Sequence, residues 1–241
     1  MHLDPEPKRN LSSAARFVGL AARRGASLCV LPELFSNRYC GQFEDTGAFL
    51  ATVPPHGEIL ERFSDLARRH SLALVVPHLE RAGPDGCYNA LAVFNGEGAL
   101  VARYRKIHIP AAEGYREDAY FRRGDLGYVV APDFDSHRDW ESVMRAQAIM
   151  NRVFIAAVNR VGPEERIRFY GGSFVADPWG KIVRRAGSSA PRLILADLDL
   201  SQSEKANSFF GFFDTRAPET YGPLTVPARG SSPGAGAGLA E

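Results

Sequence analysis

Hydrophobic residues recur along this chain with two spacings, one helical and one typical of strands. They repeat every three or four positions over about 11–24, 57–69 and 136–151, which predicts three amphipathic helices. Asn10 can cap the first helix, and Gly25 supplies its end. A short apolar run of strand length follows each helix, and this repeated order is typical of an α/β protein. The three runs lie at 27–31, 72–77 and 153–158.

Two hairpins and one further strand complete the expected elements. The stretch from Tyr88 to Lys106 predicts two strands around the turn NGEG, with Lys106 at the end of the second arm. A second hairpin is expected over 171–186, where the turn Asp177–Gly180 places proline and glycine at favoured positions. Apolar and polar residues alternate over 192–200, which predicts a half-buried strand.

The composition is that of one ordinary globular domain. With 241 residues, of which 45% are hydrophobic and 24% charged, the chain can bury a large core. We expect a single domain over 1–225 and an unstructured tail over 226–241, which is rich in Gly, Ala, Pro and Ser. The net charge is +1 and the arginines are scattered, so we expect no nucleic-acid partner.

Membrane, targeting and cofactor motifs are lacking in the sequence. No apolar run approaches the roughly 20 residues of a membrane helix, and no signal peptide is recognisable, which predicts a cytoplasmic protein without a membrane partner. The three cysteines and six histidines show no ligand spacing, so we expect neither a disulfide framework nor a metal. No GxGxxG or Walker loop stands between a strand and a helix, and no cofactor is expected.

Two charged residues stand at the ends of predicted strands. Glu33 follows the strand at 27–31, a position at which α/β proteins hold functional groups on a rigid scaffold. Lys106 is one of only 4 lysines against 25 arginines, so an ordinary surface cation there would be expected to be arginine. Taken alone, Glu33 is more typical of a solvated loop acid or helix cap and Lys106 of a cation at a strand end, and His108 is more typical of a structural histidine.

Six motifs, in order along the chain, carry a family resemblance. They are LPELFSNRYC, RYRKIHIP, GYREDAYFRRGDLG, DSHRDWESVMRAQAIMNRVFIAAVNRVG, GGSFVADPWGKI and DTRAPETYGPL. Together they resemble the nitrilase or carbon–nitrogen hydrolase superfamily, most closely its N-carbamoylputrescine amidase branch. The resemblance implies a four-layer αββα sandwich, a small-molecule amide or carbamoyl amine as substrate, no cofactor and a homo-oligomer.

The resemblance also implies roles for three residues. The family uses a Glu, Lys, Cys triad whose thiolate attacks an amide, nitrile or carbamoyl carbon. By motif, Glu33 matches the general base and Lys106 the lysine that stabilises the oxyanion. Glu117 matches a second glutamate that positions the lysine or the substrate.

The motif that would carry the nucleophile is not in this sequence. After Val130 the chain passes almost directly to the DSHRDW motif, so about fifty residues that relatives have there, including the nucleophilic cysteine, are absent. The absent segment would supply a strand, a helix and a second strand, and the chain begins after the place of the relatives' first strand. We therefore expect an incomplete, truncated sandwich with unpaired sheet edges.

None of the three cysteines matches the nucleophile. Cys40 follows Glu33 by seven residues, on the same loop, and is the weak candidate for a substitute. Cys29 lies inside a predicted strand and Cys87 lies in a turn. The motifs and the missing cysteine leave two possible functions. One is a hydrolase of N-carbamoyl amines, similar to enzymes of polyamine biosynthesis, with the cysteine of its triad missing. The other, favoured by that loss, is an inactive family member that binds a small ligand or assembles with an intact homologue.

Overall fold

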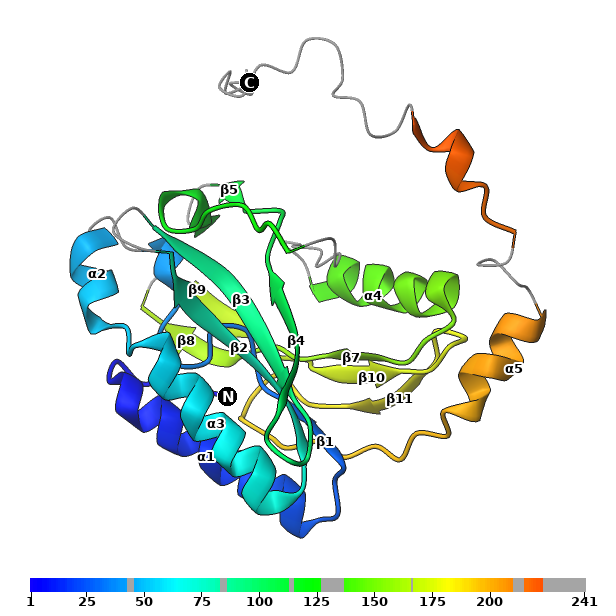
Figure 1. The fold of residues 1–241 in the computed structure, drawn as a ribbon, viewed down its shortest axis with the longest axis horizontal. Coiled ribbons are helices and arrows are strands. Elements are labelled where there is room, and N and C mark those ends of the chain that lie inside the picture. Colours follow the sequence, from blue (N-terminus) through cyan, green and yellow to red (C-terminus); the bar gives the residue numbers. More distant parts are fainter. Residues whose placement is uncertain are drawn as a thin grey trace.

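A computed structural model shows two larger β-sheets with helices packed on their outer faces (Figure 1). It describes residues 1–42, 46–82, 86–112, 115–126, 137–165, 167–209 and 215–222. The predicted tail and the junction after Val130 lie outside these residues. None of the helices that the structure describes is both long enough and apolar enough to cross a membrane.

The first sheet has four strands in the order β1-β2-β3-β4. Their bounds are β1 Leu28–Val30, β2 Ala73–Arg81, β3 Cys87–Phe94 and β4 Leu100–Arg105. β1 is parallel to β2, whereas β2, β3 and β4 form an antiparallel meander with Val76 opposite Ala92 and Leu91 opposite Tyr104. The hairpin predicted from Tyr88 to Lys106 is thus confirmed, and Lys106 directly follows its second strand.

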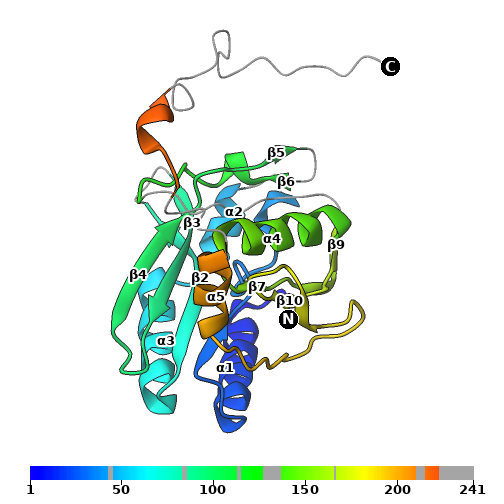
Figure 2. The same cartoon turned by 90° about the vertical axis from the view of Figure 1, so that its right-hand side faces the viewer.

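Two helices cover one face of this sheet. α1 (Pro7–Arg23) and α3 (His56–His70) pack against each other and lie along the sheet (Figure 1, Figure 2). Side chains alternate across a strand, so every second residue of β2 and β3 points to the helices. These residues join one buried core cluster with Phe35 and Phe63, whose rings meet edge to face with centroids 5.1 Å apart.

The second sheet has three antiparallel strands in the order β11-β10-β7. They are β7 (Ile155–Ala157), β10 (Phe174–Ala176) and β11 (Ile182–Arg185), and α4 (His137–Asn151) packs on one face, where Trp140 contacts Phe174. The predicted hairpin over 171–186 is confirmed. The carboxylate of Asp177 holds its turn by accepting the N–H groups of Trp179 and Lys181, each at 2.9 Å.

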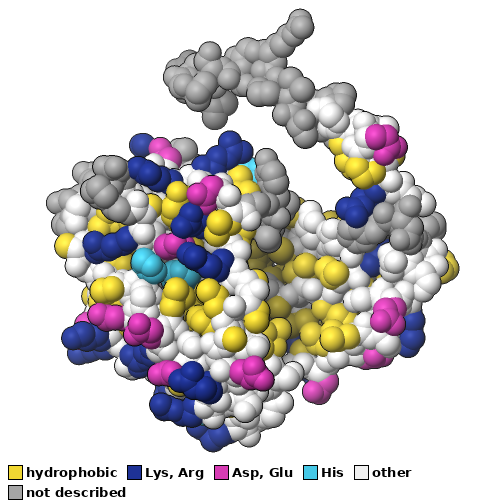
Figure 3. Space-filling model, viewed as in Figure 1, with side chains coloured by type: hydrophobic (Ala, Val, Ile, Leu, Met, Phe, Trp, Pro, Cys, Tyr) yellow, Lys and Arg dark blue, Asp and Glu magenta, His cyan; other side chains and the backbone are white. Residues whose placement is uncertain are grey.

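The sheet faces turned away from the helices are only partly covered. Val75, Leu91 and Val93 on the first sheet are half-buried, and Ala156 on the second is exposed. Figure 3 shows hydrophobic side chains gathered in a hollow between the half of the molecule that carries β4 and the half that carries α4 and the second sheet. These described residues leave apolar surface of both sheets partly exposed to water.

Short elements connect the two sheets and frame the site. The first group is η1 Cys40–Gln42, α2 Thr46–Thr52, β5 Ala111–Ala112, β6 Tyr115–Arg116 and η2 Glu117–Ala119. The second group is β8 Val161–Glu164, β9 Ile167–Tyr170, α5 Ser201–Phe209 and η3 Pro218–Thr220. β5 pairs with β6 and β8 with β9, each pair being antiparallel.

Two details of the predicted elements are wrong. α1 begins at Pro7 and not after Asn10, because proline is suited to the first helical position. Asn10 is instead buried within the helix, where its amide donates to Asp4 O and Ser36 O at 2.8 and 3.0 Å. The segment 192–200 forms no strand, since no described strand pairs with it and only Leu193 packs on the first core.

The first core gives a test of the fold. Phe63→Ala should lower the free energy of unfolding by about 3–5 kcal/mol, because it removes a fully buried ring that packs edge to face on Phe35. Urea denaturation followed by circular dichroism measures this. Val101→Ala is the matched control, because this β4 side chain is 58% exposed and its loss should cost less than about 0.5 kcal/mol. Equal effects of the two substitutions would contradict the described core.

Candidate active site

Glu33 lies in the loop that follows β1, at the carboxyl end of the parallel pair β1 and β2. The loop leaves the sheet at Leu31, whose N–H donates to Val75 O at 3.1 Å. Leu34 has a φ of 47°, a left-handed conformation that is rare for a residue other than glycine, so its surroundings must hold the loop in place. The side chain of Glu33 is 52% exposed and is therefore open to a ligand.

Lys106 is held in place by its own backbone. Its N–H donates to Asn89 O at 2.7 Å, and its carbonyl accepts the N–H of Gly124 at 2.9 Å. The side chain is only 8% exposed, and Nζ lies 3.2 Å from Glu33 Oε1 and 3.0 Å from Glu117 Oε2. The ammonium thus bridges two carboxylates as a compact point charge.

Glu117 is the buried member of the cluster. It opens η2, its side chain is 2% exposed, and its Oε1 accepts the hydroxyl of Tyr39 at 3.0 Å while Oε2 faces Lys106. The structure therefore brings Glu33, Lys106 and Glu117, the three residues that the resemblance singled out, into direct contact.

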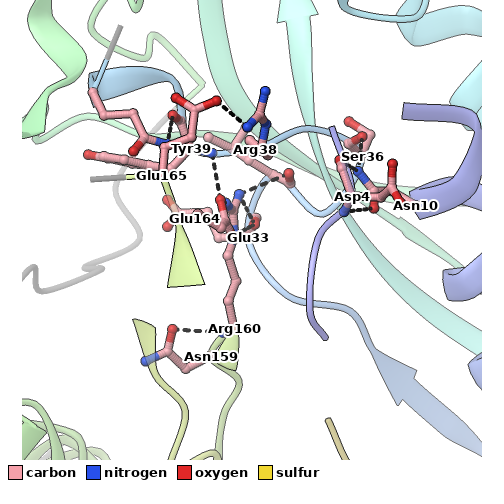
Figure 4. A network of polar contacts seen from close by, with 12 residues as sticks. Asp4, Asn10, Glu33, Ser36, Arg38, Tyr39, Asn159, Arg160, Glu164 and Glu165 are labelled. Atoms are coloured by element: carbon pink, nitrogen blue, oxygen red, sulfur yellow. Dashed lines mark hydrogen bonds and ion pairs between the residues drawn. The ribbon is translucent and has the colours of Figure 1, made fainter. Parts of the chain in front are cut away.

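Three further residues of the site were not anticipated from the sequence. Asn89 donates to Glu33 Oε1 at 2.7 Å, and a polar residue at a buried position of an apolar strand could have indicated it. Tyr39 and Arg160 gave no such indication, because Tyr39 lies 78 residues from Glu117 and Arg160 lies 127 residues from Glu33. Figure 4 shows how Arg160 reaches the loop that carries Glu33 and Tyr39.

The two carboxyl groups have pKa values shifted in opposite directions. Desolvation disfavours the charge of Glu33, but Lys106, Asn89 and Arg160 outweigh it and hold the pKa of this carboxyl below its usual value. Desolvation, reinforced by the charge of Glu33, raises the pKa of Glu117, although Lys106 and Tyr39 oppose the rise. The site therefore offers an exposed, ionised carboxylate beside an ammonium that can stabilise a negatively charged oxygen.

All three cysteines of the chain fall within described residues, and each is buried. Cys40, in η1, is 1% exposed and packs in an apolar cluster with Leu34 and Tyr120. Burial, together with the charge of Glu117, raises the pKa of the Cys40 thiol. Burial also raises the pKa of Cys29 to about 11, and it raises the pKa of Cys87. Thiols of this kind are poor nucleophiles, because the thiolate is the reactive form.

Metal ligation has no basis in the described part of the chain. Within it, no group of three or more His, Cys, Asp or Glu side chains is arranged to hold a metal ion. The charge of Lys106 occupies the place between the carboxylates that a cation would need.

Comparison with known proteins places the chain in a family. A family model described as carbon-nitrogen hydrolase matches residues 3–135 and 132–207. The chain belongs to the carbon–nitrogen hydrolase family. It is 27% identical to an N-carbamoylputrescine amidase from Oryza sativa subsp. japonica over 265 aligned positions, which cover 88% of each chain.

Solved structures agree with this family fold. A carbon-nitrogen hydrolase from Helicobacter pylori G27 superposes with a TM-score of 0.83 at 24% identity, covering 92% of this chain and 95% of that one. A mutant amidase from Nesterenkonia sp. AN1, with an acetamide moiety covalently added at its active site cysteine, gives a TM-score of 0.67 at 20% identity. That match covers 78% of this chain and 84% of the amidase. The mixed α/β architecture is thus that of carbon–nitrogen hydrolases.

The bridging role of Lys106 predicts a pH-dependent loss of stability in this family member. Lys106→Met leaves Glu117 as a buried carboxylate without its cation, which should cost about 3–5 kcal/mol of unfolding free energy at pH 8. Lys106 lowers the pKa of the buried Glu117 carboxyl, which is nevertheless raised, so removing Lys106 should raise this folded-state pKa further. Stability is then fully retained below the unfolded-state pKa and is lost as the pH rises through the folded-state pKa. The deficit relative to the unsubstituted protein should therefore be smaller at pH 5, as urea denaturation at both pH values will measure.

Lys181→Met is the matched control for this experiment. Lys181 is an exposed lysine after the turn of the second sheet, so its substitution should change stability by less than about 0.5 kcal/mol at either pH. A deficit of Lys106→Met that is the same at pH 5 and pH 8 would contradict the ion-pair geometry.

Proposed function

We propose that this chain binds an N-carbamoyl amine or a related amide beside Glu33 and Lys106 and does not hydrolyse it. The observation that carries the proposal is the assembled cluster of Glu33, Lys106 and Glu117 in a chain whose three cysteines are all buried. The first half of this observation supports binding, and the second half argues against covalent hydrolysis.

The polar groups of the site complement a carbamoyl group. Its N–H groups are donors that suit an ionised carboxylate, and its carbonyl oxygen is an acceptor that suits an ammonium. Glu33 is half exposed, so a ligand that enters from solvent meets this carboxylate first, and the Lys106 ammonium lies 3.2 Å from it. Glu117 holds the ammonium from the buried side. The rice relative is named for N-carbamoylputrescine, which makes that compound the first probe.

Hydrolysis by the family's covalent route needs a thiolate near the bound carbon. The adduct in the Nesterenkonia amidase is formed at that protein's active site cysteine. Here the thiol that follows Glu33 along the loop after β1 belongs to Cys40, which is buried in an apolar cluster and has a raised pKa. Loss of the nucleophile from such a catalytic unit typically lowers the rate by several orders of magnitude.

Binding and turnover can be measured on the same protein. Isothermal titration calorimetry should detect binding of N-carbamoylputrescine, and an ammonia assay should detect no release above the blank. Glu33→Gln should weaken binding about 10- to 100-fold, because a hydrogen bond to a charged group contributes about 1.5–3 kcal/mol.

A second glutamate provides the control for this measurement. Glu97→Gln, in the exposed turn between β3 and β4, should leave the affinity unchanged. Ammonia release that disappears in Cys40→Ser would overturn the proposal in favour of a hydrolase with a relocated thiol.

A second candidate function is hydrolysis by a protein that contains a cysteine-bearing segment missing from this sequence. The two stretches of the family match meet at 132–135, close to the short junction after Val130. The 265 positions aligned with the rice protein cover 88% of 241 residues, about 212, which leaves about 53 positions without a counterpart here. The hollow lined by hydrophobic side chains also favours this candidate.

Sequencing the gene and its transcript decides between the two candidates. The binding proposal expects the codons for Val130 and Ala131 to be contiguous in the mature transcript. An inserted segment of about fifty codons that encodes a cysteine followed by Trp and Asp would restore the hydrolase.

A further inference from the structure

A buried ion pair outside the cluster holds the loop that carries two residues of the site. Arg160 directly precedes β8 and Glu164 ends it, and their side chains are 4% and 2% exposed, with Nη1 2.9 Å from Oε2. Both lie on the hairpin of β8 and β9, far in sequence from the loop that follows β1. Their opposite charges compensate each other, and the hydrogen-bonding groups of the two side chains can therefore also bind the backbone of the loop.

The side chain of Arg160 donates hydrogen bonds to two backbone carbonyls at the start of this loop. Nε and Nη2 donate to Glu33 O at 3.1 and 2.9 Å, and Nη2 also donates to Leu34 O at 2.9 Å. These contacts fall at the point where Leu34 takes up its left-handed conformation. A planar guanidinium can serve two adjacent carbonyls and a carboxylate at once, which a single ammonium cannot do in the same geometry.

Glu164 binds the other end of the same loop, at Tyr39. Its Oε2 accepts the N–H of Tyr39 at 2.8 Å, and the hydroxyl of Tyr39 in turn donates to Glu117. Arg38 forms a further ion pair with Glu165 on the same hairpin (Figure 4). One hairpin thus reaches Glu33 through Arg160 and reaches Glu117 through Glu164 and Tyr39.

We propose that Arg160 is a positioning residue, which with Glu164 fixes the loop over 33–39 so that the Glu33 carboxylate meets Lys106 and Asn89. This inference rests on the proposed function only in taking the cluster of Glu33, Lys106 and Glu117 as the ligand site. Its consequence is that loss of the guanidinium fork should move Glu33 away from Lys106 without removing any group of the cluster.

The test measures the pKa values of Glu33 and Glu117 by NMR of protein labelled with carbon-13 at the glutamate carboxyl carbon, without ligand. Glu33→Gln and Glu117→Gln assign the two resonances. Arg160→Lys keeps the positive charge and removes the fork. We expect the pKa of Glu33 to rise towards its ordinary value, because its contacts with Lys106 and Asn89 weaken. We expect the pKa of Glu117 to fall, because the negative charge that raises it moves away.

Arg185→Lys is the matched control, since Arg185 pairs with Glu141 between β11 and α4, away from the loop. It should leave both pKa values unchanged. Arg160→Met removes the charge as well and should shift the pKa of Glu33 further in the same direction. Unchanged pKa values in a folded Arg160→Lys would overturn the inference. A chain that unfolds with either substitution at 160 would also overturn it, because Arg160 would then be structural.

The experiment separates this inference from the proposed function. Shifted pKa values in Arg160→Lys, combined with a lack of N-carbamoylputrescine binding by the unsubstituted protein, would keep the positioning role and reject the ligand. Binding of N-carbamoylputrescine by the unsubstituted protein, combined with unchanged pKa values in Arg160→Lys, would support the ligand and reject the positioning role.

Discussion

The site depends on one buried ammonium between two carboxylates. Lys106 Nζ lies 3.0 Å from Glu117 and 3.2 Å from Glu33, and without this cation two like charges would be held close together in a partly desolvated space. Because Lys106 follows β4, Glu33 follows β1 and Glu117 opens η2, three separate parts of the chain must be in place before the charges compensate one another. The sheet, its covering helices and the hairpin of β8 and β9 together provide that placement.

This arrangement gives the two acids different characters. Glu33 is half exposed and ionised, whereas Glu117 is buried with a raised pKa and faces the ammonium from the interior. An exposed carboxylate beside an ammonium can recognise a group that both donates and accepts hydrogen bonds. Breaking a C–N bond by the covalent route requires in addition a thiolate, and all three cysteines of this chain are buried.

Local patterns predicted the elements that have a clear hydrophobic periodicity or turn motif. They failed for segments whose secondary structure depends on contacts with distant parts of the chain. The periodicity over 57–69 predicted α3, and the NGEG turn predicted the hairpin of β3 and β4. The alternation over 192–200 resembled a strand but found no described partner strand, while α5 and the hairpin of β8 and β9 were not anticipated. A strand needs a neighbour, and one segment's sequence does not reveal whether a neighbour is present.

The candidate site also contains residues that the sequence identified and residues that it did not. The resemblance implied roles for Glu33, Lys106 and Glu117, so it was enough to single them out, whereas it implied none for Tyr39 and Arg160, which stand in the same motifs. Tyr39 and Arg160 act through contacts that span 78 and 127 residues, and Arg160 binds backbone carbonyls that every residue possesses. No residue type at the loop could therefore have indicated this partner. What the motifs could not give is the support that sets the angle and position of Glu33.

The most direct test of the ligand site is a crystal structure of the chain with N-carbamoylputrescine. We predict an intact ligand whose carbonyl oxygen lies about 3 Å from Lys106 Nζ and whose amide nitrogen lies against the Glu33 carboxylate. A ligand carbon bonded to a cysteine sulfur, or a ligand bound away from Glu33 and Lys106, would contradict the proposed binding role.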